Sequence, residues 1–180
     1  MNTDKNADRK ITTKENKNVS FDVNMDKNVL YDYMVHHAYS SAGGVLGTCF
    51  GFLGVLMFYR SYQLGEANWL FLIIGFLLIF YMPINLKYKA FAQMKLTEAF
   101  QKPLHYELDE NGITVSQDDT SETIEWDRCL KAVSTRLSIV VYTGKRNASV
   151  FPRKDLGDKL PALVATISQN MNPKKVKIRY

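Results

Sequence analysis

Charged side chains are missing from two long parts of this 180-residue chain. Asp, Glu, Lys and Arg are absent from residues 33–59 and again from residues 67–86. A helix that crosses a bilayer core of about 30 Å needs roughly 20 apolar residues, and both stretches reach that length. Their length and lack of polar residues for a solvent-facing side argue against two core helices of a soluble protein. The sequence therefore predicts a two-span transmembrane hairpin over residues 41–86.

The chain also has few of the residues that carry catalysis or bind metals. Its two cysteines, Cys49 and Cys129, lie in the first span and well after the second, which argues against a disulfide and leaves no CxxC pair. No glycine-rich phosphate loop of the GxGxxG or GxxxxGK[ST] type occurs. The spans lack Asp, Glu, Lys, Arg and His between residues 40 and 59 and between residues 67 and 86, so nothing there indicates a transport pathway.

The remaining candidates for chemistry are three histidines and one cysteine. His36 and His37 are adjacent, so they point to different faces of a helix; we expect structural histidines, with a metal or proton-handling role as the lesser alternative. His105 is expected to be a surface or half-buried side chain, and Cys129 a small core residue. We therefore predict no cofactor, no metal and no enzymatic activity.

Cations flank the predicted spans unequally. Lys27 lies just before the first span and four lysines follow soon after the second, whereas the connecting loop at residues 60–66 contains only Arg60. The positive-inside rule then places both termini in the cytoplasm of a multi-pass protein of a bacterial plasma (inner) membrane. The flanking cations are Lys27, Lys87, Lys89, Lys95 and Lys102.

The rest of the chain divides by composition and period. Residues 1–17 are polar and predict a disordered leader. Residues 18–40 predict a first strand at 19–25, followed by a juxtamembrane helix with Asp26 as its N-cap. Residues 87–102 predict an amphipathic linker helix that Pro103 stops, and Pro83 is either a kink or a helix boundary.

Residues 103–171 have the period of two that is typical of strands, with Asn111-Gly112 as a hairpin turn. They predict six short antiparallel strands and a C-terminal amphipathic helix, whose regular part begins near Leu160 because Pro161 is best tolerated in a first turn. Together with the strand at 19–25, the α+β domain is a small antiparallel sheet of six to seven strands capped by a C-terminal helix. The membrane hairpin is then an insertion between the first and second strands.

This order of elements resembles the pleckstrin-homology-like fold. With the segments "KPLHYELDENGI", "IEW" and "VFPRKDL", residues 18–171 resemble the YcxB-like family of bacterial membrane proteins. The shared motifs are structural: a turn glycine, a strand tryptophan and a strand-ending Phe-Pro. The resemblance implies the fold and the two-span topology, and it implies no catalytic residues.

Charge is strongly polarised along this domain. Residues 104–127 contain eight acidic and no basic side chains, whereas residues 128–180 contain twelve basic and two acidic ones. The two groups either attract each other across the sheet or form a surface that selects a partner or faces anionic lipid. Nucleic-acid binding is disfavoured, because basic and aromatic residues do not alternate. The candidate lipid or partner contacts, which include two residues of the basic tail at 172–180, are Lys145, Arg146, Arg153, Lys154, Lys174 and Lys175.

Glycine is frequent in the first span, where Gly43, Gly47 and Gly51 stand four residues apart. In lipid the helix is enforced because every backbone group must bond internally, so glycine acts there by allowing close helix contact. This ridge packs either against Gly75 within the hairpin or against another copy in a homo-oligomer.

Together these features predict a non-enzymatic integral membrane protein. It presents a cytoplasmic pleckstrin-homology-like interaction or sensing domain at the inner leaflet, where membrane lipids and an unidentified cytoplasmic protein are its expected partners. The alternative is a small pore, or an accessory or immunity-type subunit, that acts through its spans.

Overall fold

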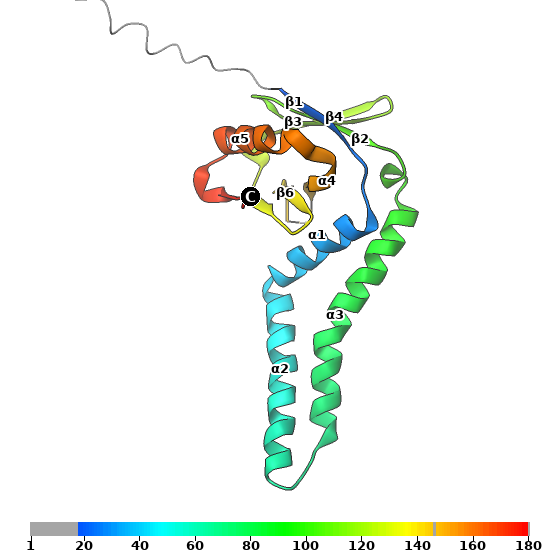
Figure 1. The fold of residues 1–180 in the computed structure, drawn as a ribbon, viewed down its shortest axis with the longest axis vertical. Coiled ribbons are helices and arrows are strands. Elements are labelled where there is room, and N and C mark those ends of the chain that lie inside the picture. Colours follow the sequence, from blue (N-terminus) through cyan, green and yellow to red (C-terminus); the bar gives the residue numbers. More distant parts are fainter. Residues whose placement is uncertain (1–17, 146, 180) are drawn as a thin grey trace, which may run out of the picture.

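A helical hairpin projects from an α+β domain in the computed structural model, which describes residues 18–145 and 147–179 (Figure 1). The hairpin consists of α2 (Ala42–Gln63) and α3 (Trp69–Leu96), and both helices are long and apolar enough to cross a membrane. Their large side chains stay exposed; Phe50 and Leu77 each keep 59% of their surface. The predicted leader at 1–17 lies outside the described residues, as do Arg146 and Tyr180.

The second helix is longer than a bilayer requires. At 1.5 Å per residue, the 28 residues of α3 span about 42 Å, so its last turns extend beyond a hydrocarbon core of about 30 Å. α3 runs through Pro83 and includes residues 87–96, so the first part of the predicted linker helix continues the second span. The helix ends at Leu96, and a 3₁₀ turn, η1 (Glu98–Phe100), follows it.

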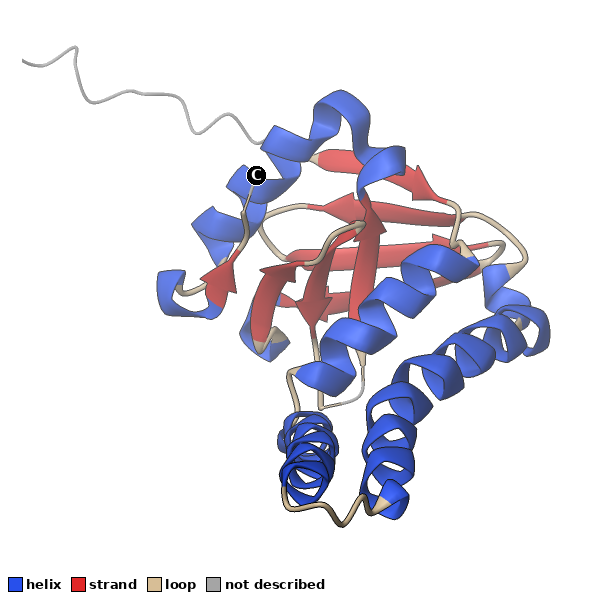
Figure 2. Cartoon of the chain, turned by 60° about the horizontal axis from the view of Figure 1, so that its bottom comes forward, coloured by secondary structure: helices blue, strands red, loops and turns tan. Residues whose placement is uncertain are grey.

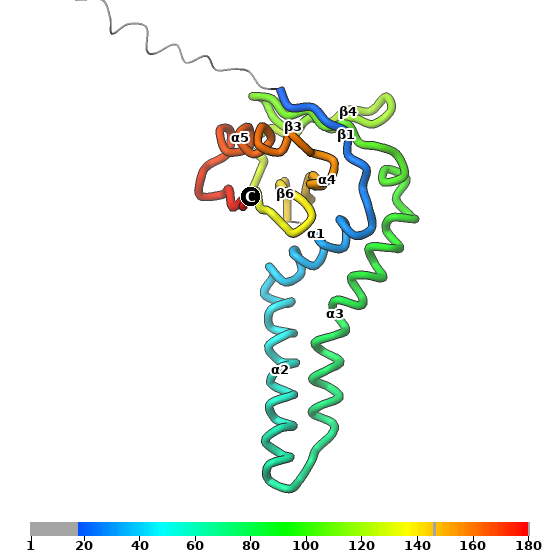
Figure 3. Tube along the Cα trace, in the orientation of Figure 1, coloured from blue at the N-terminus to red at the C-terminus, as the bar shows by residue number. Residues whose placement is uncertain are grey.

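A shorter helix, α1 (Lys27–Tyr39), lies between the domain and the hairpin (Figures 1, 2 and 3). It follows β1 (Val19–Val23), which is two residues shorter than the predicted strand. Asp26 is the N-cap residue, but its side chain makes no capping hydrogen bond to the helix backbone; its carboxylate accepts from Asn28 Nδ2 at 3.3 Å instead.

The strands form two four-stranded sheets. The first sheet has the order β1-β2-β3-β4, with β2 (Leu104–Leu108), β3 (Gly112–Gln117) and β4 (Thr120–Glu125) all antiparallel to their neighbours. Because β1 pairs directly with β2, the helical hairpin is an insertion between the first two strands, as predicted.

The second sheet has the order β7-β6-β5-β8. Its strands are β5 (Lys131–Ser134), β6 (Ser138–Tyr142), β7 (Ala148–Pro152) and β8 (Val176–Lys177). β8 pairs in parallel with β5 and comes from the predicted basic tail.

The expectation of one sheet of six to seven strands is therefore wrong. After β4 the chain leaves the first sheet through a 3₁₀ turn, η2 (Trp126–Arg128), so Trp126 is not a strand residue. The indole Nε1 of Trp126 donates to the carbonyl oxygen of Asp109 at 2.9 Å, which fixes this exit against the β2–β3 turn. Strands on the two sides of this turn pair separately.

Both sheets and the C-terminal helix enclose one main core. The chain leaves β7 through α4 (Arg153–Leu156) and η3 (Gly157–Lys159) into α5 (Leu160–Asn170), and η4 (Pro173–Lys175) leads to β8. α5 starts at Leu160 with Pro161 in its first turn, as predicted. The core residues Phe21, Tyr106 and Phe151 bring β1, β2 and β7 together through edge-on and stacked ring contacts.

The β2–β3 turn requires glycine at position 112 because of a close contact with β4, and not because of a positive φ angle. The hairpin at Asn111-Gly112 is present, but Gly112 is not among the described glycines with positive φ. A Cβ at Gly112 would overlap the carbonyl oxygen of Ile124 on β4. The turn is shaped instead by the Asp109 carboxylate, which accepts from the backbone N–H groups of Asn111 and Gly112 at 2.8 and 3.0 Å.

Candidate functional site

Three glycines hold the two long helices together. An added Cβ at Gly51 would lie 2.6 Å from Ile79 Cγ1, and one at Gly75 would lie 2.9 Å from the carbonyl oxygen of Gly51. Gly54 faces the same contact, 3.0 Å from the carbonyl oxygen of Phe71. A side chain at any of these positions would overlap or crowd the facing helix, so the two helices pack in close backbone contact at this point.

The predicted glycine ridge does not pack as one unit within the hairpin. Of its three members, Gly51 meets α3, whereas a Cβ at Gly43 or Gly47 would find nothing within 4 Å among the described residues. Gly44, outside the ridge, packs against the backbone of Ala38 where α1 turns into α2. The face with Gly43 and Gly47 is therefore open in the monomer.

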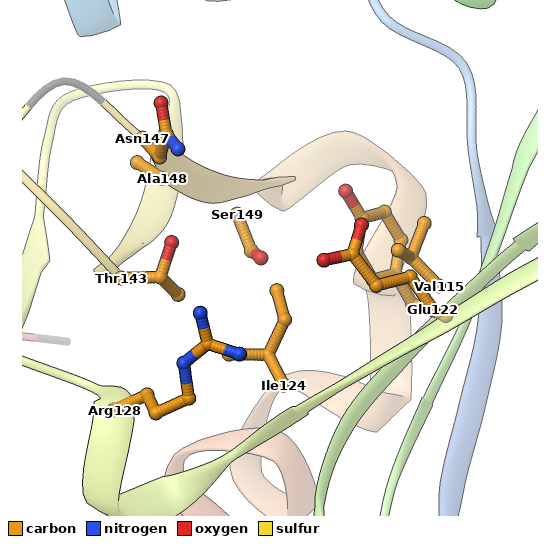
Figure 4. Close-up of a pocket in the computed structure, with 9 residues that line it drawn as sticks. Val115, Glu122, Ile124, Arg128, Thr143, Asn147, Ala148 and Ser149 are labelled. Carbon is orange, nitrogen blue, oxygen red and sulfur yellow. The ribbon is translucent and has the colours of Figure 1, made fainter.

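A polar cavity of about 240 Å³ opens between the two sheets (Figure 4). Arg128, just after β4, extends its guanidinium group into the cavity towards Ser149, and the Glu122 carboxylate lies on the opposite side. Apolar side chains complete its walls. The cavity is lined by Tyr106, Val115, Glu122, Ile124, Arg128, Thr143, Asn147, Ala148 and Ser149.

The side chains that line this cavity are rich in hydrogen-bonding groups. A guanidinium group offers five N–H donors, and the hydroxyl groups of Thr143 and Ser149 and the amide of Asn147 add further donors and acceptors. The cavity can hold a small polar or anionic group by charge-assisted hydrogen bonds.

A second pocket, of about 390 Å³, gathers cations where the domain meets the hairpin. We call it the lysine pocket. Its walls come from the end of α1, from the start of β5 and from the segment that forms η4 and β8. The lysine pocket is lined by His36, Ser40, Leu130, Lys131, Val133, Lys174, Lys175 and Lys177.

Burial and these lysines shift the pKa values of two nearby groups. Partial burial, together with the charge of Lys131, lowers the pKa of His36, although Asp32 opposes this. Burial raises the pKa of the Cys129 thiol, and nearby Lys175 only partly offsets this effect. Cys129 is 1% exposed, so it is a small core residue as expected and not a reactive thiolate.

The predicted basic residues do not form one patch. Lys174 and Lys175 enter the lysine pocket, whereas exposed Lys145 and Lys154 lie outside it and Arg146 is not described. Arg153 Nη2 donates to the carbonyl oxygen of Arg179 at 2.8 Å, so this side chain holds the segment after β8 against α4.

The three histidines also have different surroundings in the fold, and His36 is the one that lines the lysine pocket. The His37 ring stacks against both Tyr33 and Tyr142, whose rings also contact each other, and His105 Nδ1 is 2.6 Å from Asp22 Oδ1 on β1. In residues 18–145 and 147–179 no group of three or more His, Cys, Asp or Glu residues is arranged to hold a metal.

Sequence reasoning missed Lys131, Lys177 and His36 as members of a common pocket. Lys131 and Lys177 occupy neighbouring strands because β8 pairs with β5, with Val133 opposite Lys177. A two-residue strand gives no periodic signal, so its pairing depends on the folded core alone. The available signal was composition: four cations in the last nine residues.

Comparison with known proteins identifies part of this domain. Residues 108–167 match the family model described as YcxB-like protein. The matched region runs from the end of β2 into α5 and includes the three motifs that carry the resemblance: Gly112, Trp126 and the Phe151-Pro152 pair. Neither the curated proteins nor the solved structures contain a match to the chain.

Proposed function

We propose that this protein is a membrane-anchored, non-enzymatic interaction module. Its hairpin lies in the membrane, and its domain recognises a partner on the cytoplasmic side. One observation carries the proposal: α1 fastens the domain to the hairpin, so the domain has a fixed orientation towards the membrane (Figure 1). An anchor that served only as a tether would not need such a contact.

The fastening has an apolar and a polar component. Val29 of α1 is 3% exposed and packs with Val140 and Tyr142 of β6. The Asp32 carboxylate accepts from the backbone N–H of Leu137 at 3.0 Å, just before β6. On the other side of α1, Lys27 Nζ lies 5.0 Å from the ring centre of Phe91 on α3. Together these contacts connect the second sheet, α1 and α3.

The recognition surface that we propose is the polar cavity of Figure 4. A pleckstrin-homology-like fold for the domain fits the two mainly antiparallel sheets and the helix that closes the core. The acidic segment 104–127 and the basic segment 128–180 both contribute to this cavity, through Glu122 and Arg128, which supports the recognition of a polar or charged group on a protein partner.

Photo-crosslinking of the full-length protein in native membranes tests this function. A photoreactive amino acid at Asn147, on the rim of the cavity, should give one defined protein adduct, and Arg128→Gln should reduce it. The matched control places the same amino acid at Glu98, on η1 and outside the cavity, where that adduct should be absent. Partner-free ion currents in reconstituted bilayers would instead support the pore alternative, and extraction without detergent would exclude membrane anchoring.

A further inference from the structure

The lysine pocket concentrates positive charge that the fold has to bring together. Its four lysines come from β5 and from the adjacent η4 and β8, and Lys131 of β5 lies more than forty residues before the other three in the sequence. No carboxylate is among the described residues that line it, so these ammonium groups have no acidic partner in that part of the pocket wall. Like charges gathered in this way repel, and an anion in the pocket would relieve the repulsion.

The pocket lies at the level where the first long helix begins. Ser40, in its wall, is the C-cap of α1 and stands two residues before Ala42, the first residue of α2. The pocket therefore opens beside the end of a helix that is long and apolar enough to cross a membrane. An occupant at this level would lie at the height of lipid headgroups.

An exposed apolar residue accompanies the cations. Leu130 lines the pocket with 48% of its surface exposed. Among the described residues from 104 to 177, it is the only large apolar side chain that is exposed. Basic residues beside an exposed leucine are typical of a surface that meets the interface of an anionic bilayer. A site for a free, fully hydrated ion would not need the leucine.

We propose that the lysine pocket binds the phosphate of an anionic phospholipid headgroup, with Leu130 against the acyl boundary. This inference deepens the proposed function, because it rests on the hairpin being in the membrane. Lys174 and Lys175 supply the exposed ammonium groups, and the Ser40 hydroxyl donates to the phosphate from the membrane side. The bound lipid would hold the domain at a set height above the bilayer.

Two features of the pocket weaken the binding of an anion, but the positive charge of the remaining lysines is larger than both effects. The C-terminal end of α1 carries a partial negative charge, equivalent to about half an elementary charge. Lys131 Nζ lies 4.4 Å from the ring centre of Tyr142, and this cation–π contact makes the ammonium group less available to an anion. Three full charges remain at Lys174, Lys175 and Lys177, so the pocket stays positive.

Lipid retention by the full-length protein in a neutral detergent tests the proposal. Native mass spectrometry would compare phosphatidylglycerol, which is anionic, with phosphatidylcholine, which is zwitterionic. We expect Lys174→Glu/Lys175→Glu to weaken phosphatidylglycerol binding about tenfold and to leave phosphatidylcholine binding unchanged. The matched control, Lys145→Glu/Lys154→Glu, makes the same charge change outside the pocket and should keep the wild-type affinity.

Each result of these experiments either supports the lipid-binding proposal or overturns it. Equal loss in the control variant, or none in the pocket variant, would overturn it, as would full displacement of the lipid by excess inorganic phosphate. A photoreactive phosphatidylglycerol should label the segments that contain Ser40 and Leu130 in the wild type, and labelling elsewhere alone would contradict the pocket. Failure here leaves detergent-dependent extraction and the Asn147 adduct unaffected, so it is distinguishable from failure of the proposed function.

Discussion

Tyr142 lies at the contact between α1 and β6, and its hydroxyl is buried with no hydrogen-bond partner among the described residues. Burial raises the pKa of this phenol to about 12, so it stays neutral. A buried donor without a partner costs about 1–3 kcal/mol. The ring itself contacts Tyr33, His37 and Lys131, so the side chain contributes through its aromatic surface.

We therefore expect Tyr142→Phe to be neutral or to stabilise the protein by up to about 1 kcal/mol. Tyr142→Ala removes the ring and should destabilise it by about 3–5 kcal/mol. Thermal unfolding in a neutral detergent, read as the free energy of unfolding, compares the two variants. A clear loss of stability in the phenylalanine variant would mean that the hydroxyl has a partner in solution.

His36 gives the protein a specific dependence on pH. Because burial and the charge of Lys131 lower its pKa in the folded state, the unfolded chain binds more protons below the ordinary value of about 6.5. The stabilisation from neutral His36 is complete above that pH and is lost as the pH falls below it. Asp32 and His37 also act on His36, the first raising its pKa and the second lowering it.

The expected result is that His36→Gln flattens the pH dependence of the unfolding free energy between about pH 7.5 and 5.5. The difference between variant and wild type at pH 8, where His36 is neutral in both states, serves as the baseline. An unchanged slope in the variant would show that His36 keeps an ordinary pKa in the folded protein.

At the scale of elements, the two long helices depend on backbone contact at Gly51, Gly54 and Gly75. A side chain at Gly75 would meet the backbone of α2, and overpacking of this kind costs about 1–3 kcal/mol. We expect Gly75→Leu to lower the melting temperature and to separate the helices, measured by crosslinking of cysteine pairs across the hairpin.

Gly47→Leu is the matched control for that change, because a Cβ at Gly47 meets nothing within 4 Å. The hairpin should remain intact in this variant. If self-association in the membrane also stays at the wild-type level, the open face with Gly43 and Gly47 does not pair with another copy. Weaker self-association would assign that face to a homo-oligomer contact.

Elements with a strong local signal could be predicted from the sequence. The two long helices follow from the missing charges, α5 from its spacing of Leu163, Val164 and Ile167, and the β2–β3 hairpin from Asn111-Gly112. Features that depend on distant partners could not. The chain leaves the first sheet where the Trp126 indole donates a hydrogen bond to the Asp109 carbonyl oxygen, a contact between residues 17 positions apart. β8 is a strand only because its two residues pair with β5.

The candidate site was predictable only in part, for the same reason. Lys174 and Lys175 stand out in sequence because they belong to a cationic tail. Lys131 has the pattern of an ordinary exposed strand residue, and it joins them only through the parallel pairing of β5 and β8. The polar cavity is still less visible, since Arg128 of η2 and Ser149 of β7 line it from separate parts of the chain.

At the scale of the whole molecule, the positions of the two native cysteines make the orientation in the membrane testable. Cys49 lies within α2 and Cys129 is buried, so a membrane-impermeant thiol reagent should label the wild-type protein weakly. Glu66, in the loop between α2 and α3, and Asp119, at the β3–β4 turn, are exposed positions at opposite ends of the molecule. Cysteine at either position should preserve the fold, because neither side chain is in the core.

The excess of cations beside the domain and the single Arg60 at the loop predict that the loop faces outwards. In intact cells the reagent should therefore label Glu66→Cys at once, and Asp119→Cys only after permeabilisation. Labelling of Asp119→Cys in intact cells would place the domain outside and remove the cytoplasmic partner from consideration. Labelling of both before permeabilisation would mean that the apolar helices do not span the membrane, because a hairpin of this length that spans the bilayer cannot expose both ends on one side.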